Sequence, residues 1–308
     1  MMQRVLLGPQ RRIRTVGTAF ELLGVRGRIA VISAGWQERE AEDGELSRFL
    51  GNRTTNLALH ARADAAFRED QTLFTAHRTK QDRLHRLQDL YRLQLEAALT
   101  AAKRLQRIDA PADLIEPELE ATMRTIRALD KRHVARMEGI EHEYEAAVGL
   151  ARRPSIQHHV EEISSILSEC DAVAIAGGHV ASLINRIRLF GLTSLLAAKP
   201  LVGWSAGAMV LTDRIVLFHD NPPQGAGNAE ILSRGLGLAP GVVALPHASS
   251  RLNLDDPQRV SLLARRFAPA LCLALDDGCA ATLAKGWTAN GPTCRLTTDG
   301  AVVPVEGA

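Results

Sequence analysis

The sequence lacks both an excess of either charge and any long apolar run. Its 37 Lys and Arg residues nearly cancel its 35 Asp and Glu residues, so nothing in the composition favours binding to nucleic acid or to an anionic membrane. No apolar run approaches the roughly 18–20 residues that span a bilayer. The N-terminus "MMQRVLLGPQRRIR" has no apolar segment of the kind found in secretory signals. These absences predict a soluble, cytoplasmic protein.

The sequence also lacks the paired cysteines that are typical of zinc sites. Its four cysteines are not arranged with C-x-x-C spacing. In a chain of 308 residues without a signal we expect them to stay reduced. We therefore expect no zinc site. The cysteines are Cys170, Cys272, Cys279 and Cys294.

Strand-like and helix-like segments alternate over residues 1–51 and again over residues 154–308. The β-branched runs bounded by glycine, such as "GRIAVISAG" at 27–35 and "DAVAIAGG" at 171–178, are typical of strands buried on both faces of a parallel sheet. The alternation predicts an α/β fold with a doubly wound, mostly parallel sheet. Further strands are expected at 4–8, 199–204, 214–218 and 241–247, and on either side of a tight turn in "ALCLALDDGCAATLAKG".

Residues 52–153 differ from the rest of the chain. They are rich in Arg, Glu, Gln, Leu and Ala, and their apolar residues recur at intervals of three and four, as in the stretch from Leu84 to Leu99. This spacing predicts two long helices. We expect an antiparallel helical hairpin inserted into a discontinuous α/β domain. The insertion is either an arm for a partner protein or a second copy of the chain, or a cover over the main domain.

The sequence Gly203-Trp204-Ser205-Ala206-Gly207 fits the G-x-S-x-G pattern. In that pattern a sharp strand-to-helix turn, which needs small neighbours, exposes the serine hydroxyl at the end of a strand. The N–H of Ala206 would then face a developing oxyanion. The alternative is that these small residues only let a helix pack closely on the sheet.

A nucleophilic serine needs a base and an acid that orients the base. His247 ends a predicted strand in "ALPHASSRL", and His219 follows another one. Asp276 and Asp277 close a strand in "LALDDGCA", whereas Asp220 lies in "LFHDNPP". Each of these aspartates could instead form a turn or cap a helix.

Four segments together resemble a known peptidase family. They are "AIAGGHVASLI", "GWSAGAM", "GLGLAPGVVALPH" and "LALDDG". They are similar to peptidase family S51, which includes aspartyl dipeptidase and cyanophycinase and has a class I glutamine amidotransferase-like fold. The resemblance covers residues 156–283, extends more loosely to residues 4–35 and omits the insertion. It implies cleavage of an amide bond in a small peptide, with an aspartyl residue on the acyl side.

The resemblance also implies roles for individual residues. By position, Ser205 would be the nucleophile and His247 its base, with Gly178 and Ala206 as oxyanion donors. Asp277 stands where the family has Glu, so it would be the orienting acid, although its side chain is one methylene shorter.

Three further positions extend or depart from the family pattern. An Asp soon after the elbow in the dipeptidase branch makes Asp220 a possible supporting residue. His179 replaces the usual Asn or Asp, so the substrate edge of the site should differ. Arg251 matches an Arg of the cyanophycinase branch and suits a substrate carboxylate, although a surface salt bridge is equally compatible with it. The elbow carries serine where amidotransferases of this fold have cysteine, which disfavours glutaminase chemistry.

Two functions from different classes follow from these patterns. One is a serine peptidase or amidohydrolase acting through Ser205, His247 and Asp277 without a metal or cofactor. The other is a weakly active or inactive scaffold or sensor whose helical insertion binds a protein partner or forms a dimer.

Overall fold

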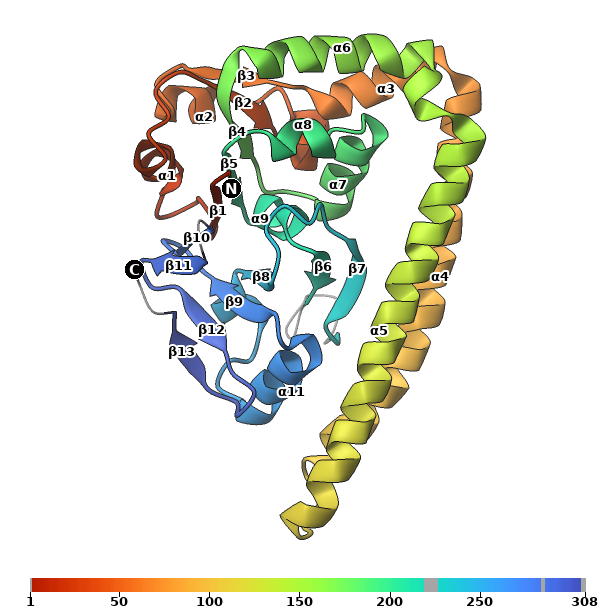
Figure 1. Cartoon of the computed structure of the whole chain (residues 1–308), viewed down its shortest axis with the longest axis vertical. Helices are drawn as coiled ribbons and strands as arrows, with labels where there is room; N and C mark the ends of the chain where they lie inside the picture. Colours follow the sequence, from red (N-terminus) through yellow and green to blue (C-terminus); the bar gives the residue numbers. More distant parts are fainter. Residues whose placement is uncertain (1, 219–226, 284–285, 306–308) are drawn as a thin grey trace.

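The computed structural model describes residues 2–218, 227–283 and 286–305, and its centre is a seven-stranded sheet. In spatial order the strands are β11 (Trp287–Asn290), β10 (Ala280–Leu283), β1 (Arg4–Leu7), β5 (Leu201–Trp204), β4 (Cys170–Ile175), β2 (Arg28–Ile32) and β3 (Thr54–Asn56) (Figure 1). The strands from β1 to β3 in this order are parallel, and β10 and β11 are antiparallel. The prediction of an α/β fold with a mostly parallel central sheet is confirmed.

Two smaller sheets accompany the central one. The first contains β13 (Val302–Pro304), β12 (Cys294–Leu296), β9 (Leu271–Leu275) and β8 (Val242–Pro246), with β8 and β9 parallel. The second is an antiparallel pair of β6 (Arg214–Leu217) and β7 (Glu230–Arg234). The predicted strands β9 and β10 thus belong to different sheets, because the chain after β9 turns to pair with β1. A strand pattern shows which residues form a strand, but it does not show which partner that strand pairs with.

Alternation along the central strands divides their side chains between two cores, since successive residues of a strand point to opposite faces. Val5 and Leu7 of β1 pack on one face with Phe20 of α1 (Val16–Leu22), while Leu6 faces the other core. That second core is covered by α3 (Leu59–Glu69), α6 (Pro154–Ser168), α7 (Val180–Leu189), α8 (Thr193–Ala197) and α9 (Ala206–Leu211). Short elements complete the domain: η1 (Ala34–Arg39), α2 (Gly44–Phe49), η2 (Leu150–Arg152), α10 (Ala248–Arg251) and α11 (Pro257–Phe267).

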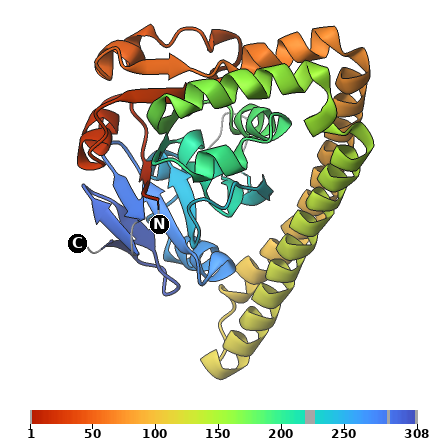
Figure 2. The same cartoon turned by 45° about the horizontal axis from the view of Figure 1, so that its top comes forward.

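A long helical hairpin runs along one side of the α/β domain and past α11 (Figures 1 and 2). Its arms are α4 (Gln71–Leu105) and α5 (Ala112–Val148). Leu99 and Met123 pack together, and Leu262 of α11 joins their apolar cluster. Strand β3 and helix α3 also fall within the predicted insertion 52–153, and β3 pairs with β2. Within the described residues, no helix combines the length and apolarity needed to cross a membrane.

A buried polar network joins the hairpin to the α/β domain. Arg266 of α11 donates from Nε to Asp130 Oδ2 of α5, and from Nη2 to Asp130 Oδ1, both at 2.7 Å. Tyr91 of α4 donates its hydroxyl to the same carboxylate at 2.6 Å. The side chains of Arg266 and Asp130 are only 1% and 4% exposed. Gln88 of α4 donates to the Ile231 carbonyl oxygen of β7 at 3.2 Å, so the hairpin is attached to two elements of the domain.

Candidate active site

A cleft of about 1020 Å³ opens where the carboxyl ends of the parallel strands meet. Loops that follow β1, β2, β4, β5 and β8 all contribute to its walls. This is the usual place for a ligand site in an open α/β sheet. The lining residues used below are Arg11, Gly178, His179, Ser205, His247 and Arg251.

Ser205 lies on a sharp turn between β5 and α9. Its backbone is in the left-handed region, with φ 49° and ψ −118°, which is strained for any residue other than glycine. The flanking glycines make the turn possible. A Cβ on Gly203 would lie 2.7 Å from the Gly207 carbonyl oxygen, and one on Gly207 would lie 2.0 Å from the Ile175 carbonyl oxygen. The motif is therefore a sharp elbow that presents the serine to the cleft, and close packing alone does not account for it.

The loop after β4 lies directly beside the serine. A Cβ on Gly177 would come within 2.9 Å of the Ser205 Cβ. Gly178 has φ +113°, and a Cβ there would lie 2.3 Å from the Gly35 carbonyl oxygen. In the described part of the chain the Gly178 N–H has no backbone acceptor. Ala206 is the first residue of α9, so its N–H has no acceptor within the helix.

His247 is the histidine that the structure brings to Ser205. Its Nε2 lies 3.4 Å from the Ser205 Oγ. This is longer than the roughly 2.6–3.2 Å of a working general base, a separation that is common before substrate binds and tightens the site. Its backbone is left-handed, with φ 58° and ψ 34°, and its N–H donates to the Leu275 carbonyl oxygen of β9. Burial, followed by the charges of Arg251 and Arg11, lowers the pKa of His247 below its ordinary value. A lowered pKa keeps the imidazole neutral, the form that accepts a proton.

The two candidate acids differ in their surroundings. Both Oδ1 and Oδ2 of Asp276 accept from the Ser249 N–H, at 3.1 and 3.2 Å, so this carboxylate binds a backbone N–H group of α10. Asp277 has a buried Oδ1 without a hydrogen-bond partner in the described structure. Both carboxylates raise the pKa of His247, Asp277 more than Asp276. No hydrogen bond joins Asp277 to His247 within the described residues.

Two arginines bring positive charge to the cleft. Arg251 follows His247 by one helical turn, and its N–H donates to the His247 carbonyl oxygen at 3.0 Å. Burial, together with the charge of Arg11, lowers the pKa of Arg251. Among residues 2–218, 227–283 and 286–305, neither arginine forms an ion pair, whereas Arg14 and Arg39 of the same cleft pair with Glu45 and Glu42. The cleft thus offers two guanidinium groups to an anionic ligand.

Arg11 and Gln37 are site residues that none of the sequence motifs indicated. Arg11 lies four residues after β1, so the rule that site residues follow parallel strands would have found it. Gln37 donates from Nε2 to the Ser182 Oγ at 2.9 Å, and Ser182 in turn contacts His179. No local sequence signal could reveal that contact, because 145 positions separate its two ends. His219 and Asp220 lie outside the described residues.

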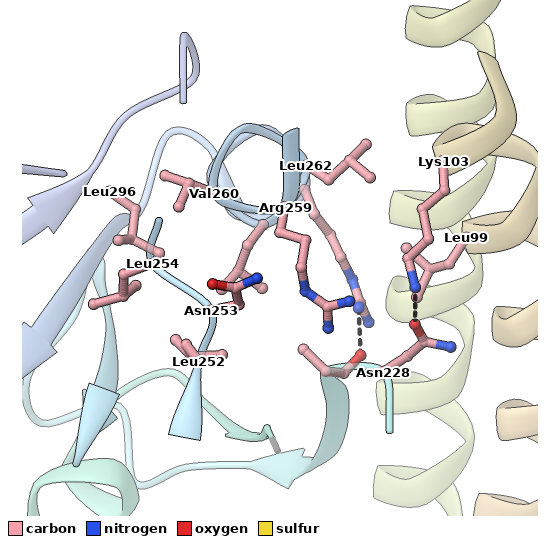
Figure 3. Close-up of a pocket in the computed structure, with 13 residues that line it drawn as sticks. Leu99, Lys103, Asn228, Leu252, Asn253, Leu254, Arg259, Val260, Leu262 and Leu296 are labelled. Atoms are coloured by element: carbon pink, nitrogen blue, oxygen red, sulfur yellow. Dashed lines mark hydrogen bonds between the residues drawn. The ribbon is translucent and has the colours of Figure 1, made fainter. Parts of the chain in front are cut away.

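A second, smaller cavity lies between the hairpin and the α/β domain (Figure 3). Leucine is the commonest residue of its lining, and Lys103 of α4 donates there to the Asn228 Oδ1 at 2.6 Å. Neither Ser205 nor His247 lines it, so we place the candidate active site in the larger cleft. Within the described residues, no three His, Cys, Asp or Glu side chains form a group that could hold a metal ion.

Comparisons with known proteins bear on the family and the fold of the chain. The model of peptidase family S51 matches residues 145–288, which contain the elbow, His247 and both candidate acids. A crystal structure of a peptidase from an acI-B1 actinobacterium has a similar fold, with a TM-score of 0.50 and 13% identity over 100% of this chain and 95% of that one. A structure of a putative peptidase E protein from Listeria monocytogenes EGD-e is more distant, with a TM-score of 0.31 and 17% identity over 52% of this chain and 77% of that one. No curated protein matches the sequence.

The family match and the fold likeness differ in how much of the chain they cover. The family match is confined to the region that carries Ser205 and His247, whereas the likeness to the actinobacterial peptidase extends over the whole chain, hairpin included. The resemblance to peptidase family S51 that the sequence motifs predicted is therefore confirmed, with residues 145–288 as the matching region.

Proposed function

We propose that this chain is a serine peptidase or amidohydrolase that cleaves an amide bond in a small peptide or peptide-like substrate. The observation that carries the proposal is the 3.4 Å approach of Ser205 Oγ to His247 Nε2 at the cleft. The match to peptidase family S51 supports peptide hydrolysis as the reaction class. We assign the sheet to the class I glutamine amidotransferase-like fold and the enzyme to the cytoplasm as parts of the same proposal.

The residues around the scissile bond divide the chemistry among them. Ser205 Oγ attacks the carbonyl carbon while His247 Nε2 takes its proton, and the N–H groups of Gly178 and Ala206 hold the resulting oxyanion. His247 then passes the proton to the leaving amine, so the C–N bond breaks and an ester to Ser205 remains. A water molecule, deprotonated by His247, attacks this ester. His247 then returns the proton to Ser205 Oγ as the C–O bond breaks and the acid is released. No metal or cofactor is needed for these steps.

Ser205 as nucleophile is tested by labelling with a fluorophosphonate. The wild-type chain should be labelled and Ser205→Ala should not, because the probe reacts with an activated serine hydroxyl. His247→Gln should label far more slowly. Ser249→Ala is a matched control, since Ser249 is an exposed serine beside the site that offers only its backbone N–H. Equal labelling of wild type and Ser205→Ala would rule the proposal out, and an unlabelled wild type would favour the scaffold alternative.

Asp277 is our choice for the acid that orients His247. Its Oδ1 is buried without a partner, whereas Asp276 is engaged by Ser249. Replacing the orienting acid by its amide leaves the geometry but favours the wrong imidazole tautomer. Asp277→Asn should therefore lower kcat by about a hundredfold or more, and Asp276→Asn by much less. The opposite ranking would assign the role of orienting acid to Asp276. If neither substitution lowered kcat, Asp220 would become the candidate acid.

The cleft's arginines favour a substrate with a carboxylate on the acyl side. Arg251 is half-buried and unpaired within the described residues, and a guanidinium binds a carboxylate through two parallel hydrogen bonds. Aspartyl p-nitroanilide should therefore be cleaved faster than alanyl p-nitroanilide, and Arg251→Ala should remove that preference through KM. A wild-type enzyme that cleaves both equally would exclude a carboxylate site.

We also propose that the hairpin joins two copies of the chain. Leu90 and Leu93 lie one turn apart on α4 and are 55% and 68% exposed, and exposed leucines at this spacing favour a helical contact. Light scattering should give a dimer for the wild type and a monomer for the double variant Leu90→Glu, Leu93→Glu. Leu22→Glu, at an equally exposed leucine on α1, is the control and should stay dimeric. A monomeric wild type would exclude this contact.

A further inference from the structure

His179 at the edge of the cleft is held by residues from two different loops. It is the N-cap of α7, where its Nδ1 accepts the Ser182 N–H at 3.2 Å and lies 2.9 Å from the Ser182 Oγ. Gln37 of η1 donates from Nε2 to that same Oγ at 2.9 Å. The His179 N–H donates to the Gly35 carbonyl oxygen at 2.7 Å. The loops after β2 and β4 are therefore fastened together at His179.

These contacts determine which ring nitrogen of a neutral His179 carries the proton. A backbone N–H can only donate, so the Nδ1 that receives the Ser182 N–H must present its lone pair. The proton of the neutral ring is then on Nε2. In the described structure no protein group accepts from Nε2, and the side chain is exposed at the cleft wall. His179 therefore offers one directed N–H to a ligand.

The position of Gln37 is itself unusual. Its backbone is left-handed, with φ 57° and ψ −124° inside η1, a conformation that strains a residue with a side chain. The same turn brings its amide to Ser182, so a conformation that costs free energy is combined with a contact that orients His179. Such strain is typical of functional sites.

We propose that Gln37 and Ser182 are positioning residues that hold His179 as an uncharged donor to a substrate oxygen beside the scissile bond. Gly178, the preceding residue, carries the expected oxyanion N–H, and His179 lines the same cleft as Gly178 and Ser205. A substrate with a carboxylate or carbonyl oxygen near that bond is the class that fits. The proposal rests on the proposed peptidase function, and it adds a specificity-determining residue and its two supports.

Two substitutions of His179 separate recognition from helix capping. In His179→Asn the side-chain oxygen can still cap the Ser182 N–H, but no donor remains where Nε2–H stands. In His179→Gln a longer side chain can carry an N–H toward the Nε2 position while the cap is lost. If His179 recognises substrate, the His179→Asn substitution should lower kcat/KM for aspartyl p-nitroanilide by about tenfold, with little effect on alanyl p-nitroanilide. The His179→Gln variant should retain most of the activity on both substrates.

A purely structural role of His179 gives the opposite ranking. His179→Asn would then behave as wild type, and His179→Gln would lose thermal stability and activity on both substrates; this result overturns the proposal. Ser182→Ala and Gln37→Ala should reduce the aspartyl preference less than His179→Asn, without loss of fluorophosphonate labelling. Labelling reports the Ser205–His247 pair alone, so a chain that is not labelled contradicts the proposed function, whereas a labelled chain with an unaffected Asn variant contradicts only this inference.

The tautomer can also be measured without any substrate. Long-range ¹⁵N–¹H correlation NMR, with His179→Asn used to assign the ring, should show a neutral His179 with its proton on Nε2. In Ser182→Ala, which keeps the backbone N–H but removes the contact with Gln37, this tautomer should persist while the ring becomes more mobile. A ring protonated at Nδ1 in the wild type would overturn the inference whether or not the chain is a peptidase.

Discussion

At the scale of single residues, the candidate site depends on backbone conformations that cost free energy. Ser205, His247 and Gln37 all have positive φ values. Ser205 and His247 line the cleft, and Gln37 contacts Ser182, the partner of His179. The surrounding structure must hold each of them in place, because a residue with a Cβ is strained in this region. Gly203 and Gly207 provide the space for Ser205, since any side chain there would collide with backbone atoms.

The arginines near His247 lead to a prediction about pH. Burial and the charges of Arg251 and Arg11 lower the pKa of His247, so the base stays neutral, and active, to a pH below the ordinary histidine value of about 6.5. The acid limb of kcat/KM should therefore lie below that value. Arg11→Gln should raise the pKa and move the limb toward higher pH, while Arg11→Lys should leave it in place. An acid limb at the same pH in the wild type and in Arg11→Gln would contradict this account.

At the scale of helices and strands, the hairpin is part of the domain's structure. Tyr91, Asp130 and Arg266 form a closed, buried group in which each polar atom has a partner from another element. Gln88 and Arg92 of α4 both donate to Glu230 at the start of β7. Leu232 of that same strand lines the cleft, so the hairpin supports one wall of the candidate active site.

Breaking the buried ion pair should destabilise the protein strongly. Asp130→Asn leaves the Arg266 charge buried without its counter-ion, which we expect to lower the free energy of unfolding by about 3–5 kcal/mol. Glu116→Gln removes an exposed partner of Arg265 from the same helix pair and should cost about 1 kcal/mol or less. Urea denaturation followed by circular dichroism measures both variants. Similar decreases in the free energy of unfolding for the two variants would show that the buried Arg266–Asp130 pair contributes no more to stability than the exposed pair.

Two histidines of the hairpin predict that stability falls in acid. Burial lowers the pKa of His77 to about 3 and that of His133 to about 4. An unfolded histidine binds its proton near pH 6.5, so the unfolded state takes up more protons than the folded one below that pH. The free energy of unfolding should fall by up to about 1.4 kcal/mol per pH unit for each histidine as the pH drops from 6.5 toward 4.

A substitution tests the share of one histidine in this acid sensitivity. His77 packs between the rings of Phe67 and Tyr144, so His77→Phe keeps an aromatic side chain but removes the titrating group. The variant should show a shallower loss of stability between pH 6.5 and 4 in urea denaturation. An exposed histidine, His85, serves as the control, and His85→Gln should leave the slope unchanged. An unchanged slope in His77→Phe would assign the sensitivity to other groups.

At the scale of the whole molecule, the hairpin and the α/β domain share apolar surface as well as polar contacts. Leu262 of α11 is buried in the cluster that the two arms form, and Arg127 of α5 donates to the Arg265 carbonyl oxygen at 2.6 Å. Both contacts are made by α11. Removing the hairpin would therefore expose the apolar side of α11 and leave Arg266 without its carboxylate.

Replacing residues 71–148 by a short Gly-Ser linker tests whether the hairpin is a separate arm. We expect the shortened chain to unfold at a much lower temperature and to lose fluorophosphonate labelling, because Arg266 and Leu262 lose their partners. Thermal unfolding and labelling of the same samples provide the two readouts. A shortened chain that stays folded and is labelled like the wild type would show instead that the hairpin is an independent binding arm.

The sequence by itself determined the fold class, the long helical hairpin and the elbow, because each depends on local spacing. Period-two and period-3.6 patterns specify strands and helices. The G-x-S-x-G motif contains in Gly203 and Gly207 the small residues that its sharp turn requires. The pairing partners of β9 and β10, the contact between Gln37 and Ser182 and the burial of Asp130 against Arg266 were decided only by the tertiary structure. Each of these joins residues far apart in the chain, and their proximity depends on packing that no single segment contains.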